Sequence, residues 1–145
     1  MTSTDTIFFQ VNSDLNNLEF VLSQFESVKQ CWIPNKPWLE CQLALAEAFT
    51  NAVRHAHCNQ PIDTLIDIEI LVSETAIIIK IWDYGQPFDL IQAINVKVNS
   101  DCPPDPFNLS IGGRGLTIIN KVADKLSYDR LEDERNCLII YKTIE

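Results

Sequence analysis

Glycine and histidine are both scarce in this sequence of 145 residues, which contains four glycines and two histidines. Neither GxGxxG nor GxxxxGK[ST] occurs, so a dinucleotide-binding turn and a P-loop are not expected. His55 and His57 lie in one short stretch, which gives little support to a Ser-His-Asp or Cys-His triad. Side chains two residues apart on a helix face away from each other. A zinc site formed by the two histidines and Cys58 is therefore disfavoured.

Basic residues are also few. Eleven Lys and Arg stand against twenty Asp and Glu, giving a net charge of -9. This excess of negative charge disfavours a nucleic-acid backbone or an anionic membrane as the main partner. The five cysteines are odd in number, widely spaced and without a CxxC pair, which indicates reduced thiols rather than a disulfide framework.

Long apolar runs are absent too. No stretch approaches the length of a membrane span, and no basic region followed by an apolar run marks a signal peptide. We therefore expect a cytoplasmic protein. The length and the hydrophobic content of 46% suit a single domain over residues 1–145 with a sizeable core.

Hydrophobic periodicity divides the chain into strands and helices. The predicted strands are residues 6–11, 65–72, 76–82, 125–130 and 136–143. The predicted helices are residues 15–31, 37–57 and a third that follows Gly115. The strand at 76–82 is nearly all apolar, as a central strand is. The hairpins imply antiparallel pairs, so we expect an α+β fold: a two-layer α/β sandwich whose mixed, mostly antiparallel sheet carries the helices on one face.

The segment at 83–111 differs from the rest of the chain. It holds four of the seven prolines and several Asn, Asp and Ser residues. A short helix is expected at 91–98, and the remainder is interpreted as a long loop. Such loops in compact domains are usually functional lids or disordered.

Polar residues on the helix at 37–57 form a row. Glu47, Asn51 and His55 are spaced four apart, so they stack along the side opposite an apolar face. A row of this kind is either a solvated face or one wall of a binding site.

Two further motifs suit ligand binding. Gly112-Gly113-Arg114-Gly115 opens a helix, where unpaired N–H groups and close backbone approach favour phosphate; the alternative is a flexible turn or tight packing. Asp83-Tyr84-Gly85 ends an apolar strand, and its carboxylate can accept a hydrogen bond from an amine beside a flat ring; the alternative is an ordinary acidic turn.

Taken in order, these motifs resemble the GHKL ATP-binding domain (the Bergerat fold) of DNA gyrase, histidine kinases and MutL. Within that group they are similar to the small anti-sigma factor serine-protein kinases. The resemblance extends over essentially the whole chain. It rests on Glu47-Ala-x-x-Asn51-Ala-x-x-His55-Ala, Asp83-x-Gly85-x-Pro87-Phe88-Asp89, Gly112-Gly113-x-Gly115-Leu116, Asp124-x-Leu126-x-Tyr128 and Asn136-x-Leu138.

The resemblance implies a role for each motif residue, with ATP or ADP and Mg²⁺ as cofactors. Glu47 is the expected general base. Asn51 is the expected direct ligand of Mg²⁺, and Glu47 would contact the same ion through a water molecule. Asp83 would accept a hydrogen bond from the adenine amino group, and Gly85 would leave room for the adenine ring. The other expected nucleotide contacts are Arg54, His55, Phe88, Gly112, Gly113, Arg114, Gly115 and Leu116.

Two positions depart from the family pattern. Pro87 stands where many members have a glycine, and its fixed φ would stiffen that turn. Asn136-Cys137 stands where the last strand often begins with a threonine that supports adenine binding, which puts that contact in doubt.

The leading functional expectation is an ATP-dependent serine-protein kinase that phosphorylates a STAS-domain anti-anti-sigma protein and sequesters a sigma factor, as a homodimer, without nucleic acid or membrane. The second hypothesis is a nucleotide-gated binding module without catalysis. A histidine kinase fragment needs a phosphoacceptor histidine on a separate helix, and gyrase-like or MutL-like roles need further domains. A zinc protein using His55, His57 and Cys58 is the most remote alternative.

Overall fold

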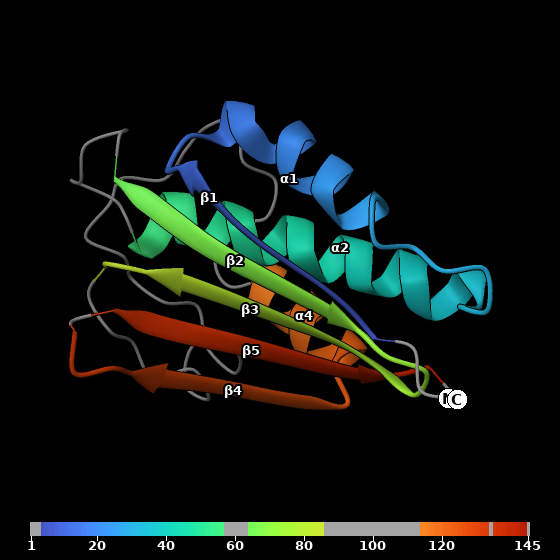
Figure 1. Cartoon of the computed structure of the whole chain (residues 1–145). Coiled ribbons are helices and arrows are strands. Elements are labelled where there is room, and N and C mark those ends of the chain that lie inside the picture. The colour runs from blue at the N-terminus through green and yellow to red at the C-terminus, as the bar shows by residue number, and fades with distance from the viewer. Residues whose placement is uncertain (1–3, 57–63, 86–113, 134, 145) are drawn as a thin grey trace.

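A computed structural model of the chain describes residues 4–56, 64–85, 114–133 and 135–144. Within these ranges, the strands form one sheet in the order β1-β2-β3-β5-β4 (Figure 1). The strands are β1 (Asp5–Asn12), β2 (Leu65–Val72), β3 (Ala76–Asp83), β4 (Lys125–Arg130) and β5 (Asn136–Thr143). All four pairings are antiparallel, which confirms the predicted α+β fold.

The helices cover one face of this sheet (Figure 1). They are α1 (Leu18–Glu26), α2 (Asn35–Asn51) and α4 (Arg114–Val122), with a 3₁₀ turn η1 (Leu15–Asn17) and a π-helical segment η2 (Ala52–Ala56). α2 packs against both α1 and α4. One core of buried side chains joins the three helices to the sheet, so the helices form a single layer over it.

β3 is the middle strand of the sheet, as its apolar sequence predicts. Ile77, Ile79 and Ile81 alternate onto the helix-facing side and are buried. Ile79 pairs with Ile70 of β2 and with Ile140 of β5, so apolar residues meet across three strands. This row forms the floor beneath α2.

An aromatic pair joins α1 to α2. The rings of Phe25 and Trp38 stack with centroids 4.0 Å apart, and both side chains are fully buried. The indole N–H of Trp38 donates to Glu26 Oε1 at 2.8 Å, so the one polar atom of the ring has a partner.

The boundaries of α1 and α2 differ from the prediction. α1 ends at Glu26 rather than residue 31, because the next N–H groups turn back to carbonyls three residues earlier, as Val28 does to Phe25 over 3.2 Å. α2 begins at Asn35, with Pro34 as its extended N-cap residue, so Pro37 lies in the first turn as predicted. α-helical geometry then ends at Asn51, because η2 is π-helical.

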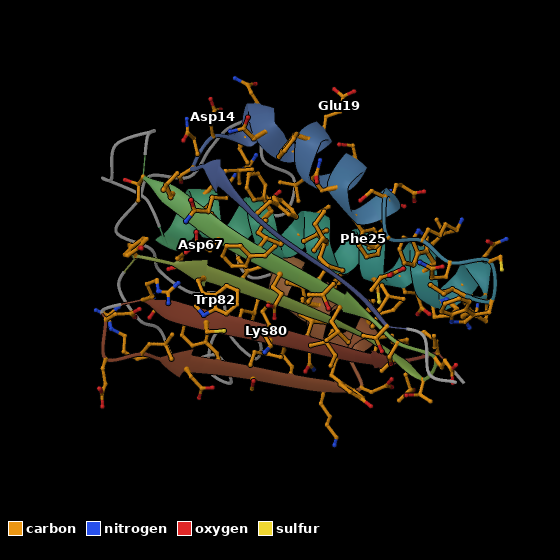
Figure 2. The ribbon with its side chains drawn as sticks, viewed as in Figure 1. Asp14, Glu19, Phe25, Asp67, Lys80 and Trp82 are labelled. Carbon is orange, nitrogen blue, oxygen red and sulfur yellow. The ribbon has the colours of Figure 1, made fainter. Side chains whose placement is uncertain are left out.

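On the sheet face opposite the helices, an arginine covers a buried carboxylate. Asp67 of β2 is only 3% exposed, and Arg135 Nη1 lies 3.0 Å from its Oδ2. The guanidinium also sits 5.6 Å from the ring centre of Trp82 on β3. Figure 2 shows Asp67 and Trp82 on these neighbouring strands. Separately, among the helices in the described ranges, none is long and apolar enough to cross a membrane.

Candidate functional site

Several of the elements that carry predicted site residues have their ends on one side of the molecule. β3 and β4 end there and β5 begins there, and the C-terminal end of α2 lies at the same end (Figure 1). The antiparallel register sets Asn136 opposite Asp83 on one side and opposite Arg130 on the other. Three strands therefore present polar residues at the same edge of an otherwise apolar layer.

Asp83 is a buried carboxylate, 5% exposed, at the last position of β3. Its Oδ1 accepts two hydrogen bonds of 2.9 Å, from the backbone N–H of Gly85 and from Nδ2 of Asn136. Burial raises the pKa of Asp83, while the hydrogen bonds from Asn136 and Gly85 and the charge of Arg130 oppose that rise. Both bonds from the described residues end on Oδ1, so Oδ2 can accept from a ligand amine.

Asn136 and Arg130 belong to this site, although the sequence left the adenine contact at Asn136 in doubt and gave Arg130 no role. Asn136 is fully buried and touches Asp83, and Arg130 Nη1 donates to the carbonyl of Gly85 at 2.9 Å. Two signals pointed to Asn136: its place where the family often has an adenine-supporting threonine, and its position at the head of an apolar strand, since a buried carboxamide needs polar partners.

Cys137, the next residue of β5, does not supply a nucleophile here. It is buried, and burial raises the pKa of its thiol to about 11. The thiolate, which is the reactive form, is therefore rare near neutral pH.

Glu47 and Asn51 lie one turn apart on α2, as predicted, and both are half-buried. The amide nitrogen Nδ2 of Asn51 is buried and has no hydrogen-bond partner among the described residues. A buried donor without an acceptor is costly, so this position suits a bound group that brings oxygen atoms. An Asn side chain also offers the carbonyl oxygen that Mg²⁺ accepts as a ligand.

His55 lies in η2, beyond the α-helical part of α2 that carries Glu47 and Asn51. The spacing of four assumed 3.6 residues per turn, but the backbone of Ala52–Ala56 is π-helical, with wider turns. The alignment of His55 with Glu47 and Asn51 therefore stays a prediction. Arg54 lies in the same segment and is half-buried.

The glycine motif is partly placed. α4 begins at Arg114, so Arg114, Gly115 and Leu116 form its first turn, where backbone N–H groups have no partner within the helix. α4 packs against α2, the helix that carries Glu47 and Asn51. Phe88, Gly112 and Gly113, like Pro87, His57 and the helix predicted at 91–98, lie outside the described residues.

Comparison with known proteins gives a consistent result. A family model described as the histidine kinase-like ATPase domain matches residues 11–142. The serine-protein kinase RsbW of Listeria monocytogenes serovar 1/2a is 34% identical over 92 residues, covering 62% of this chain and 58% of that protein. The RsbW of serotype 4a strain HCC23 is 33% identical over the same shares of the two chains. The matched region is thus less than two thirds of these relatives' own length.

Proposed function

Because the chain belongs to the histidine kinase-like ATPase domain family, we propose that it is an ATP-dependent serine-protein kinase and anti-sigma regulatory factor. Its substrate is a serine of a STAS-domain anti-anti-sigma protein, and its second partner is a sigma factor. The observation that carries the proposal is the buried carboxylate of Asp83, held by Gly85 and Asn136 at the end of the molecule where α2 carries Glu47 and Asn51. The name of the similar proteins, serine-protein kinase, supports the reaction.

The adenine ring is proposed to bind at the end of β3. Oδ2 of Asp83 accepts the N–H of the 6-amino group, which gives a charge-assisted hydrogen bond. Gly85 is buried beside it and has no side chain, so the flat ring can approach the backbone.

The phosphates are proposed to lie between α2 and the first turn of α4. Asn51 would hold Mg²⁺ through its side-chain oxygen, and phosphate oxygens would supply further ligands, as is usual for this ion. When bound, the ion neutralises negative charge on the transferring phosphoryl group. That matters in a chain whose net charge is -9. The N–H groups at the start of α4, with Gly115, are oriented along a helix dipole that favours anions.

Glu47 is proposed as the general base. Its carboxylate takes the proton from the serine hydroxyl as the serine oxygen bonds to the γ-phosphorus. The bond from phosphorus to the β,γ-bridging oxygen breaks, and ADP leaves. Arg54 and Arg114 are further candidates for contacts to the phosphates.

The test is phosphoryl transfer from labelled ATP to a STAS-domain protein in the presence of Mg²⁺. We expect wild-type protein to label the serine, and Glu47→Gln to bind ATP but transfer about 10²-fold more slowly or worse. Glu19→Gln, an exposed glutamate of α1, is the matched control and should transfer normally. ATP binding without any transfer by the wild type would refute the kinase. Unchanged partner regulation in Glu47→Gln would then favour the nucleotide-gated binding module.

We also propose that the protein acts in the cytoplasm as a homodimer built from one such domain per chain. Sedimentation equilibrium of the purified chain tests the dimer, and a monomer at micromolar concentration would contradict it.

A further inference from the structure

Every polar atom in the side chain of Asn136 is engaged, although this residue is completely buried. Nδ2 donates to Oδ1 of Asp83 at 2.9 Å and to the carbonyl oxygen of Gly85 at 2.8 Å. Its own Oδ1 accepts from Nη1 of Arg130 at 3.2 Å. A carboxamide has two N–H donors and one carbonyl acceptor, and all three find partners here.

The chemistry of these partners determines which way the amide points. A reversed amide would set its oxygen against the carboxylate of Asp83 and the carbonyl of Gly85, which are both acceptors. It would also set its N–H groups against the guanidinium of Arg130, which has only donors. The orientation with Nδ2 toward Asp83 is therefore the only one that satisfies all the groups.

Resting on the proposed nucleotide site, we propose that Asn136, braced by Arg130, is the positioning residue that holds and orients the carboxyl group of Asp83, and so makes the site prefer a 6-aminopurine to a 6-oxopurine. With Oδ1 of Asp83 occupied by two donors, its Oδ2 is the oxygen left to meet the purine. An ionised Oδ2 accepts an N–H but repels the lone pairs of a 6-oxo group.

Loss of Asn136 should weaken this discrimination, because the carboxyl group loses a donor that fixes its orientation and favours its charged form. Burial raises the pKa of Asp83, and the hydrogen bond from Asn136 is the largest of the influences that oppose this rise. Without that bond the carboxyl holds its proton to higher pH. A protonated carboxyl is a donor as well as an acceptor, so a 6-oxo group is no longer repelled.

Arg130 and Asn136 also hold the backbone beyond β3. Nη1 of Arg130 donates to the carbonyl of Gly85 at 2.9 Å, and Asn136 donates to the same oxygen. Residues of three strands therefore bond to the backbone of Gly85, so the same hydrogen-bond network that holds the carboxylate also holds the backbone proposed to contact the adenine ring.

The experiment measures the affinity of the full chain for ATP, GTP and purine riboside triphosphate, which lacks the 6-amino group. We expect wild-type protein to favour ATP over both by about 10- to 100-fold, the range of a hydrogen bond to a charged group. In Asn136→Ala both ratios should fall toward one, and ATP affinity should begin to drop with acidification at a higher pH than in the wild type. Asn16→Ala, an exposed asparagine of η1, is the control and should keep both ratios.

Failure of the inference is separable from failure of the nucleotide site. A wild type that binds no ATP would overturn the nucleotide proposal itself. A wild type that binds ATP without preference, or a folded Asn136→Ala that keeps the wild-type ratios, would overturn the role of Asn136. If Asn136→Ala does not fold, as judged by thermal melting, Arg130→Gln decides, because the arginine is exposed. That variant should lose part of the preference, and unchanged ratios would overturn the proposal.

Discussion

The carboxylate of Asp83, at the end of β3, accepts a 2.9 Å hydrogen bond from the side chain of Asn136, which lies directly opposite it at the start of β5. This bond joins two buried polar residues at the edge of an apolar layer. A buried carboxylate is unfavourable for stability unless it is well partnered, and proteins keep such groups where function requires them. We therefore expect Asp83 to lower the stability of the protein while serving the proposed nucleotide binding.

Asp83→Asn should stabilise the protein while weakening ATP binding. The amide oxygen of the new side chain can still accept from Gly85 and Asn136, and the buried charge is gone. We expect the midpoint of thermal unfolding at pH 7 to rise by about 3 °C. ATP affinity should fall at least about tenfold, because an N–H now replaces the acceptor Oδ2. Asp129→Asn, at an exposed position of β4, is the control, and a lower midpoint in Asp83→Asn would contradict this account.

The same variant has a defined pH dependence. Burial raises the pKa of Asp83 in the folded state above the ordinary aspartate value of 3.8. The wild type therefore loses stability relative to Asp83→Asn as pH rises from about 3.8 through the folded pKa. Thermal melts between pH 3 and pH 7 should show a gap that is small in acid and widens with pH. A gap that narrows with rising pH would mean that the pKa is lowered instead.

Asn51→Ala should affect the metal-dependent part of nucleotide binding. We expect ATP affinity in Mg²⁺ to fall about tenfold or more, while affinity in a chelator changes little. Stability should not fall, since the Nδ2 that is removed is a buried donor without a partner among the described residues. Isothermal titration with and without Mg²⁺ checks this, with Asn35→Ala at the exposed start of α2 as the control. An equal loss in both conditions would remove Asn51 from the metal site.

Arg135→Met should destabilise the fold through Asp67. The variant leaves a carboxylate that is 3% exposed without the guanidinium 3.0 Å away, so we expect a loss of about 3 kcal/mol in the free energy of unfolding. Lys80→Met is the matched comparison, because its ion pair with Glu69 is longer, at 3.7 Å, and more exposed. That variant should lose less than about 1 kcal/mol. Urea unfolding of both proteins would show whether burial separates the two ion pairs, and similar losses would argue against it.

Asp124 should contribute stability at neutral pH and lose it in acid. Its Oδ2 accepts from the N–H of Thr143 at 2.6 Å and from the hydroxyl of Thr143 at 2.7 Å, and these bonds lower the pKa of Asp124. A lowered folded pKa means that the stabilisation is present above 3.8 and disappears as pH falls through the folded value. Asp124→Asn should therefore melt a few degrees below wild type at pH 7 and level with it in strong acid. A difference that persists in acid would point to another cause.

The sequence by itself determined the strands, the layers and the family. The apolar runs and alternation in β2, β3 and β5 predict their bounds closely, because burial of one sheet face requires side chains at a period of two. Glu47 with Asn51, and Asp83 with Gly85, are recognisable because each pair lies within one turn or one strand end. The end of α1 and the π-helical turn after Asn51 were missed, since helical spacing does not encode how the last backbone N–H groups find acceptors.

Only the tertiary structure decided what surrounds Asp83. Asn136 is 53 residues away along the chain, and Arg130 lies 45 residues from Gly85. The sequence around Asn136 and Arg130 does not show that they contact Asp83 and Gly85, so Asn136 looked like a departure from the family pattern. The register of β3, β5 and β4 sets these residues side by side, and burial then obliges every polar atom among them to find a partner.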